Sequence, residues 1–272
     1  MDREQIEIPG LEIYPNIFKG IELGPRNNRQ LVGILIGAGG SGKDRILCEM
    51  MAINKFSHLI TATARLRRFS AINPEDKARL TEIASTALTR EHHNQILKTF
   101  EKEGLATLEP ENAYVWMRWM KPSDGTEENY HNNLKQEYHL VESSAHNESF
   151  YGTPLSSLIM DENSQSIPVV RIEINGAVTL NQLIPQDEFQ VVNFTVVPDS
   201  LDQCQDEMID RAVISEKELN NRIQKNIEDS QRYKDITNFY IKNTRLEING
   251  RPGIETTVNS LAQLTDDLLR SE

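Results

Sequence analysis

Cysteine is scarce in this sequence of 272 residues, which contains only Cys48 and Cys204. Two thiols that lie far apart along the chain exclude a disulfide framework and a cysteine-rich zinc site. Both lie in segments with helical patterning, and free thiols are typical of a reducing compartment. We therefore expect a cytoplasmic protein that is stabilised by its hydrophobic core.

Long hydrophobic runs and excess positive charge are also lacking. No stretch of 18 apolar residues occurs and no apolar leader precedes the first charged residues, so neither a membrane span nor a signal peptide is expected. The 29 Lys and Arg residues face 41 Asp and Glu residues, which gives a formal net charge of −12. This acidity argues against general binding to nucleic acid, although a local pocket for one phosphorylated ligand is compatible with it.

Apolar residues recur with strand-like and helix-like periods in turn along most of the chain. Strands are expected at 31–36, 58–63, 114–120, 168–174, 189–197 and 236–241. Helices are expected at 46–53, 74–104, 177–184, 201–208, 216–233 and 254–269. Residues 1–30 are predicted to form an extended arm and residues 121–135 a loop. The alternation predicts an α/β fold with a parallel sheet flanked by helices.

The strongest chemical signal is Gly37-x-x-x-x-Gly42-Lys43, which follows an apolar strand and opens a helix. A glycine-rich turn lets successive backbone N–H groups point at phosphate oxygens, and the lysine adds a positive charge. We therefore predict an ATP-binding loop made of Gly37, Ala38, Gly39, Gly40, Ser41, Gly42, Lys43 and Asp44. The alternative is a strand–helix turn that binds nothing.

Asp44 departs from this phosphate-loop pattern, in which a Ser or Thr hydroxyl normally holds Mg²⁺. A carboxylate is also a hard oxygen ligand, so Asp44 is predicted to bind the Mg²⁺ that accompanies ATP. Without the metal, its charge would repel a nearby phosphate.

Three further segments carry a resemblance. They are Thr61-Ala62-Thr63-Ala64-Arg65-Leu66-Arg67-Arg68, then Phe150-Tyr151-Gly152-Thr153-Pro154 with Glu142 nine residues before its tyrosine, and Arg171-Ile172-Glu173-Ile174-Asn175-Gly176-Ala177. Together with the glycine loop they resemble the guanylate kinase family over residues 31–243, apart from one large insertion. The resemblance implies a nucleoside monophosphate (NMP) kinase fold, with a small lid at about 206–217.

The resemblance also implies roles for single residues. The GMP-binding set would be Thr61, Arg65, Arg68, Tyr114, Glu142, Tyr151, Thr153 and Glu173. Paired guanidiniums suit a phosphate dianion, and a carboxylate suits the N–H donors of guanine. Arg211 and Arg222 would stabilise the transferred phosphoryl group beside Lys43, and Asn243 would lie near the adenine.

The sequence differs from the family pattern at several points. Arg171 and Glu207 reverse the charge that the family has at these positions. Residues 69–113 form a mostly helical insertion, for which a surface for a protein partner is one expected role. His92 and His93 lie within it and are expected to be solvated.

The sequence thus predicts an arm at 1–30, a core domain at 31–60 and 155–272, and an NMP-binding lobe at 61–154. The expected function is ATP- and Mg²⁺-dependent phosphorylation of a nucleoside monophosphate, GMP in the first place. The alternative is a catalytically impaired module that binds a nucleotide or a protein. Small nucleotides are the expected ligands, with no nucleic acid or membrane among the partners.

Overall fold

The structure is a computed structural model, and it describes residues 8–64, 66–67, 69–87, 90–109, 114–117, 127–146, 149–158, 166–211, 216–244, 247–248 and 251–270. The chain forms two compact units. The first comprises Met1–Leu59 and Met160–Glu272, and the second comprises Ile60–Ile159. Each unit has a hydrophobic core of its own.

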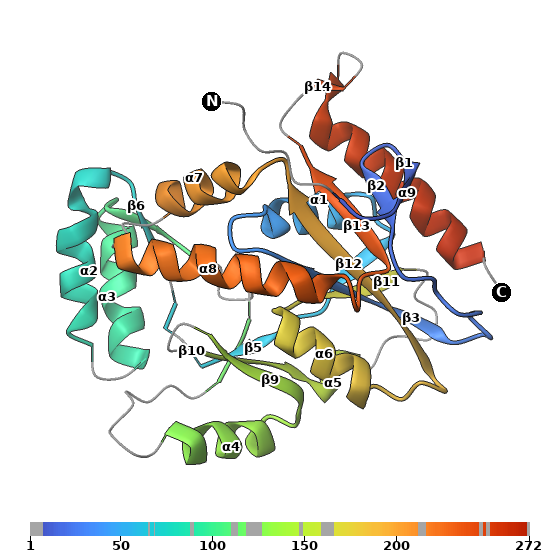
Figure 1. Ribbon diagram of the computed structural model, residues 1–272. Coiled ribbons are helices and arrows are strands. Elements are labelled where there is room, and N and C mark those ends of the chain that lie inside the picture. The colour runs from blue at the N-terminus through green and yellow to red at the C-terminus, as the bar shows by residue number, and fades with distance from the viewer. Residues whose placement is uncertain are drawn as a thin grey trace. The chain divides into compact units, whose positions relative to one another are not determined.

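A mixed sheet of seven strands forms the centre of the first unit (Figure 1). Its order is β1 (Leu11–Tyr14), β2 (Ile17–Lys19), β13 (Phe239–Asn243), β12 (Phe189–Pro198), β3 (Gln30–Gly37), β11 (Ile167–Arg171) and β4 (Phe56–His58). The five strands from β13 to β4 are parallel, as the alternation of strands and helices predicted. The sheet is flanked by helices, so the α/β class is confirmed.

Both faces of this sheet are covered, which explains why the central strands are apolar at nearly every position. Helices α1 (Lys43–Ala52) and α9 (Gly253–Arg270) share one hydrophobic cluster with alternate residues of the strands, among them Leu35 and Phe194. Helices α6 (Ile174–Leu183) and α8 (Glu216–Tyr233) contact each other, and α7 (Leu201–Arg211) contacts β12. Asn181 of α6 donates a hydrogen bond to Asn193 Oδ1. Asn193 is next to Phe194 in β12, so the two side chains lie on opposite faces of the sheet.

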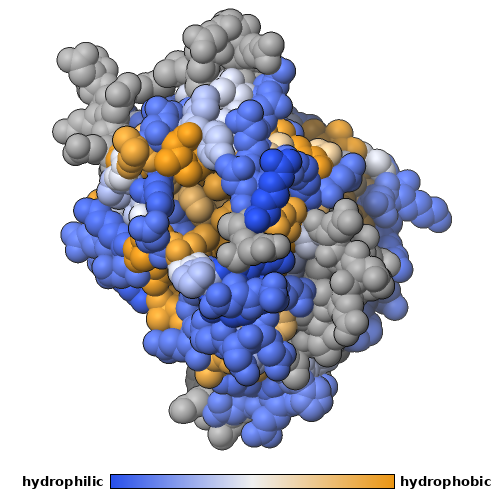
Figure 2. Space-filling view, turned by 90° about the vertical axis from the view of Figure 1, so that its right-hand side faces the viewer, coloured by the Kyte–Doolittle hydropathy of each residue, from blue (hydrophilic) through white to orange (hydrophobic). Residues whose placement is uncertain are grey.

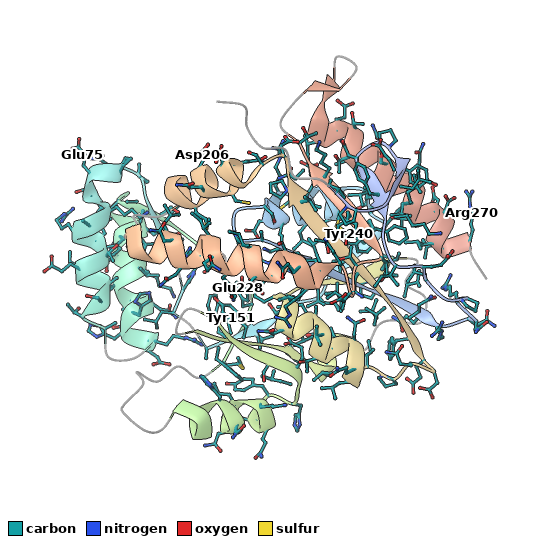
Figure 3. The ribbon with its side chains drawn as sticks, in the orientation of Figure 1. Glu75, Tyr151, Asp206, Glu228, Tyr240 and Arg270 are labelled. Atoms are coloured by element: carbon teal, nitrogen blue, oxygen red, sulfur yellow. The ribbon has the colours of Figure 1, made fainter. Side chains whose placement is uncertain are left out.

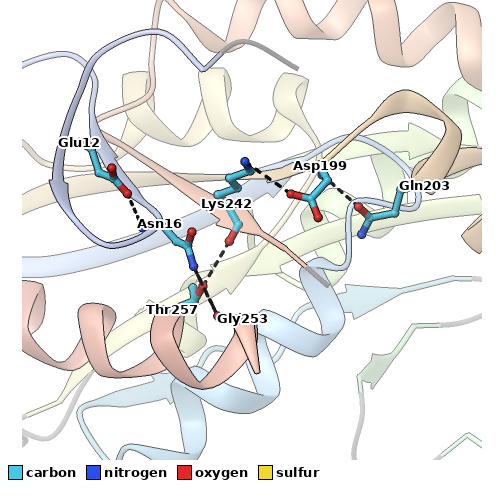
Figure 4. Close-up of polar contacts among 7 residues, drawn as sticks. All are labelled: Glu12, Asn16, Asp199, Gln203, Lys242, Gly253 and Thr257. Carbon is cyan, nitrogen blue, oxygen red and sulfur yellow. Dashed lines mark hydrogen bonds and ion pairs between the residues drawn. The ribbon is translucent and has the colours of Figure 1, made fainter. Parts of the chain in front are cut away.

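Residues 11–19 correct the prediction of an irregular arm, because they form the antiparallel hairpin β1–β2 at the edge of the sheet. Asn16, at the turn, anchors this hairpin (Figure 4). Its amide nitrogen donates to Thr257 Oγ1 at 2.9 Å, and its backbone nitrogen donates to Glu12 Oε1 at 2.8 Å. Lys242 of β13 accepts from the same threonine hydroxyl through its carbonyl oxygen, so hairpin, sheet and α9 meet at one side chain.

The second unit holds a sheet of four short strands and a separate pair of antiparallel strands. The sheet order is β8 (Val115–Trp116), β5 (Ala62–Thr63), β10 (Ser149–Pro154) and β9 (Leu140–His146). Helix α4 (Glu127–Glu137) packs on β9 through Leu134 and Leu140. Helices α2 (Lys77–Ser85) and α3 (Arg90–Lys102) form another cluster with the antiparallel strands β6 (Phe69–Ala71) and β7 (Ala106–Leu108), between which they lie in the sequence.

The predicted helix at 74–104 is confirmed, but it is divided into a 3₁₀ turn and the helices α2 and α3. The 3₁₀ turn η1 (Pro74–Asp76) starts it, and the Asn73 side chain accepts from the backbone nitrogen of Glu75 at 3.2 Å, as a capping residue does. His93, which was expected to be solvated, is buried instead. Its ring nitrogens lie 3.3 Å and 2.9 Å from the carbonyl oxygens of Ala84 and Arg67. The prediction of two solvated histidines was wrong for His93, because its side chain points inward.

Two other expectations need correction. The expected loop at 121–135 contains α4 from Glu127 onward, and the strand at 58–63 is two strands, β4 and β5. Of the strand at 114–120, residues 118–120 lie outside the described residues. The remaining short elements are α5 (Leu155–Leu158), β14 (Glu247–Ile248) and β15 (Arg251–Pro252). No helix within the described ranges is long and apolar enough to cross a membrane.

A cavity of about 540 Å³ lies in the first unit between the hairpin, the starts of the central strands and α9. Its lining includes Leu23, Leu31, Gln190, Phe239 and Leu264. On the face that carries α9, hydrophobic residues gather in patches among hydrophilic ones (Figure 2). Leu31, Gln190 and Phe239 belong to the amino-terminal parts of their strands, so the cavity lies at the end of β3 opposite to the glycine loop.

Phe194 tests the core of the first unit. It is fully buried, and its ring meets Phe56 edge-on at 6.2 Å and stacks on Phe239 at 5.9 Å between centroids. Phe194→Ala should lower the free energy of unfolding by about 3–5 kcal/mol in urea denaturation, because it removes buried area and leaves a cavity. Leu183→Ala, at a side chain 53% exposed, should change it by less than about 1 kcal/mol. Similar losses for both variants would contradict this account of the core.

Candidate functional site

The glycine loop leaves the carboxyl end of β3 and enters α1 at Lys43. Gly40 and Gly42 have φ angles of +76° and +87°, in the left-handed region. A Cβ on Gly40 would lie 2.3 Å from the Cys204 carbonyl oxygen, and one on Gly42 would lie 2.1 Å from Asn243 Nδ2. Glycine is therefore required at both positions by backbone conformation and by close approach.

The Lys43 side chain folds over the loop. Its ammonium donates to the carbonyl oxygens of Gly37 at 2.6 Å and Ala38 at 2.9 Å. The positive end of the α1 dipole adds to this charge. A cation thus lies at the mouth of a helix N-terminus, which is an arrangement that attracts phosphate.

Two asparagines brace the loop from other elements. Asn226 of α8 accepts from the Gly39 backbone nitrogen at 2.8 Å and donates to the Gly39 carbonyl oxygen at 3.1 Å. Asn243, at the end of β13, donates to the Ser41 carbonyl oxygen at 2.8 Å. Within the described part of the chain, the buried hydroxyl of Ser41 has no hydrogen-bond partner. The structure therefore brings Asn243 to the glycine loop, whereas the resemblance implied a place near the adenine.

Asp44 forms an ion pair with Arg171, which ends β11 next to β3. The Asp44 side chain is about half exposed and that of Arg171 is 27% exposed. A guanidinium that already occupies the carboxylate repels a dication, so this donor set does not fit Mg²⁺. Among the described residues, no group of three or more His, Cys, Asp or Glu side chains is placed to hold a metal ion.

A buried polar stripe on α8 escaped the sequence analysis. Asn226, Asp229 and Tyr233 are between 6% and 8% exposed and follow one another at helical spacing. Burial raises the pKa of the Asp229 carboxyl, and the negative charge of Glu173 raises it further. Glu173 is the N-cap residue of α6. The signal that could have found the stripe is the polar residue recurring on the inward side of the predicted helix at 216–233.

Cys204 lies under the loop and is 1% exposed. Burial raises the pKa of its thiol to about 11, against a smaller lowering by the charge of Lys43. The thiol stays protonated at neutral pH and acts as a packing group.

In the second unit, Glu142 and Thr153 face each other across the pair β9 and β10. Glu142 is 1% exposed, and its Oε1 accepts from Thr153 Oγ1 at 2.7 Å. Its other oxygen, Oε2, is buried without a hydrogen-bond partner among the described residues. Burial raises the pKa of this carboxyl above its ordinary value, although the bond from Thr153 opposes the shift. Such a group is suited to a ligand that brings N–H donors.

The predicted tyrosines lie close together in this unit. The rings of Tyr114 and Tyr151 are 6.5 Å apart, and Tyr114 also meets Trp116 at 5.5 Å. Tyr151 lies on β10, beside which Figure 3 labels it. The Arg90 guanidinium lies 5.4 Å from the centre of the Trp116 ring. Thr61 is buried and precedes β5, where Ala62 pairs with Gly152.

The remaining predicted residues are placed less completely. Arg65 and Arg68 lie outside the described residues. Arg211 ends α7 and Glu207 lies within it, but neither side chain belongs to the described part, and the centre of the predicted lid, 212–215, lies outside it. Arg222 is on α8. Hence the structure assembles the loop set in the first unit, and Glu142, Thr153, Tyr114 and Tyr151 in the second.

Asn226→Ala tests the brace on the loop. The variant should speed amide hydrogen exchange at Gly39 about fivefold, since a net loss of about 1 kcal/mol per hydrogen bond is typical. As a control, Gln224→Ala removes an exposed hydrogen bond to Glu228 on the same helix and should leave the amide exchange rate at Gly39 unchanged. Equal exchange rates in the wild type and Asn226→Ala would show that the brace does not hold the loop.

Glu142→Gln tests the buried carboxyl. The folded-state pKa of Glu142 is raised above 4.5, so the folded protein binds the proton more tightly than the unfolded chain does. Glu142 must then lower the stability of the wild type as pH rises from about 4.5 through the raised pKa, and this contribution is absent from the glutamine variant. Urea unfolding across this pH window should show the variant gaining stability relative to the wild type. The exposed Glu103→Gln should show no such gain.

No protein-family model matches this sequence, and no curated protein matches it. Among solved structures, the chain is similar to guanylate kinase from Anaplasma phagocytophilum, with 13% identity, a TM-score of 0.49, and 92% of this chain and 89% of that chain covered. It is also similar to TT1252 from Thermus thermophilus, with 14% identity, a TM-score of 0.42, and 89% and 99% of the two chains covered.

Proposed function

We propose that the loop Gly37–Gly42 with Lys43 binds the phosphates of ATP. The observation that carries this proposal is the Lys43 ammonium held over a strand–loop–helix turn whose glycines have left-handed backbone. The buried Ser41 hydroxyl supports it, because a phosphate oxygen would supply the acceptor that this donor lacks among the described residues.

We further propose that the chain is a phosphotransferase that acts on a nucleoside monophosphate, with GMP as the first candidate. In this proposal Glu142 reads the base, and its buried Oε2 would accept from the N–H donors of guanine. The other proposed acceptor-binding residues are Thr61, Thr153, Glu173, Tyr114, Tyr151, Arg65 and Arg68. Lys43, Arg211 and Arg222 would neutralise charge on the transferred phosphoryl group.

Each protein group in this proposal acts by position and charge. Phosphoryl transfer asks little covalent chemistry of the protein, so the fixed ammonium of Lys43 and the loop N–H groups would lower the barrier electrostatically. Divalent cations accompany ATP in most such enzymes, but the Asp44 carboxylate does not fit this role, because Arg171 already occupies it.

A second candidate is a binding module without turnover. It is favoured because polar groups of the loop already have hydrogen-bond partners within the protein. The Gly39 amide donates to Asn226, and the Lys43 ammonium donates to carbonyl oxygens of the loop. The insertion at 69–113 would then offer the surface for a protein partner.

The test is ADP release from ATP with GMP, dGMP, AMP, CMP or UMP as acceptor. GMP-dependent release that falls by about 10²–10³-fold in Lys43→Met is expected, because one electrostatic group at the reacting phosphate is removed. Lys234→Met, at an exposed lysine after α8, is the matched control and should keep full activity. No release with any acceptor from a folded sample would favour the binding module.

A further inference from the structure

Two departures from the family pattern noted in the sequence, Arg171 and Asp44, lie against each other in the fold. Arg171 stands opposite Leu35 in the parallel pair of β11 and β3, two residues before the glycine loop begins. Asp44 is the second residue of α1, directly after Lys43. Their side chains form an ion pair, although the residues are far apart in the sequence. The pair therefore lies at the edge of the sheet from which the glycine loop emerges.

Asp44 alone would oppose the binding of a polyphosphate, because its negative charge stands where a phosphate loop normally offers a neutral hydroxyl to Mg²⁺. Arg171 cancels that charge. A guanidinium has five N–H donors in a planar fork, so one that holds a carboxylate can also donate to a phosphate oxygen. A dication at Asp44 would have to displace this guanidinium or lie against its positive charge.

We propose that the Asp44–Arg171 ion pair takes the place of the divalent cation at this loop, so that the chain binds a nucleotide polyphosphate without a metal. The inference rests on the proposed binding of ATP phosphates by the loop and specifies how their charge is met. Lys43 and Arg171 are the two cations that serve the phosphates, and Asp44 holds Arg171 in position.

The experiment is isothermal titration calorimetry of the full chain with ATP and with inorganic triphosphate, in excess Mg²⁺ and in EDTA. The wild type should bind both ligands in EDTA with a Kd within about threefold of its value in Mg²⁺. Arg171→Gln should weaken binding in EDTA by about tenfold or more. Arg45→Gln removes the same charge from an exposed residue next to Asp44 and should bind as the wild type does.

Two variants separate the proposal from simpler explanations. Asp44→Asn should keep binding in EDTA, because the amide oxygen of asparagine can still accept from Arg171 and hold it in position. A metal ligand at this position would instead make the variant lose Mg²⁺-dependent binding. The double variant Asp44→Asn with Arg171→Gln should stay weak in EDTA. Wild-type affinity in the double variant would overturn the proposal, because Arg171 would then serve only to neutralise Asp44.

Other outcomes are equally decisive. Two results would overturn the metal-free site and leave the proposed ATP binding intact. In the first, the wild type binds only with Mg²⁺. In the second, Arg171→Gln binds in EDTA as the wild type does. No binding of either ligand under either condition would overturn both. Thermal unfolding of each variant must match the wild type, and if Arg171→Gln fails to fold, Asp44→Asn alone still decides between a metal ligand and a positioning residue.

Discussion

The burial of β3 is the constraint on which the first unit depends. This strand pairs in parallel with β12 over eight residues and with β11 on its other side, and all but its first residue are buried. Its length and register fix the point at which the glycine loop leaves the sheet. The parallel direction of the neighbouring strands then brings their ends, Arg171 and Asn243, to the same edge. That edge is where ligands bind in open parallel sheets.

Several polar groups of this edge are already engaged with the protein. Asn226 holds the Gly39 amide, loop carbonyls hold the Lys43 ammonium, and Arg171 holds Asp44. A phosphate ligand must exchange these contacts for its own, and exchanges of hydrogen bonds change the free energy by only about 1 kcal/mol each. The affinity of the proposed phosphate ligand would therefore depend on charge, to which Lys43, Asp44 and Arg171 contribute.

Buried acids occur in both units and each lowers stability at neutral pH. Glu142 in the second unit and Asp229 in the first have pKa values raised by burial. A carboxyl that is costly to ionise in the folded protein is a feature of functional sites, since a ligand can relieve the cost. Glu142 carries the clearer case, because its Oε2 is buried and lacks a hydrogen-bond partner among the described residues.

The sequence by itself determined the elements whose cause is local. The apolar run at 31–36, the glycines after it and the helix that follows were readable, because burial on two faces and left-handed backbone restrict the residues allowed. Local composition failed for α4, whose polar sequence resembles a loop, and for the hairpin β1–β2, which is held by Asn16 and its contacts with α9. The resemblance predicted that Glu142 and Thr153 belong to one site, but it did not predict that the Glu142 carboxylate is buried.

Only the tertiary structure decided which distant residues meet. Asp44 and Arg171 each read as an isolated departure in the sequence, and the parallel pairing of β11 with β3 makes them one ion pair. His93 read as a solvated residue until the packing of α3 turned it toward two carbonyl oxygens. The reason is the same in each case: backbone propensity is set by neighbours in the chain, whereas charge pairing and burial depend on contacts that the fold creates between remote segments.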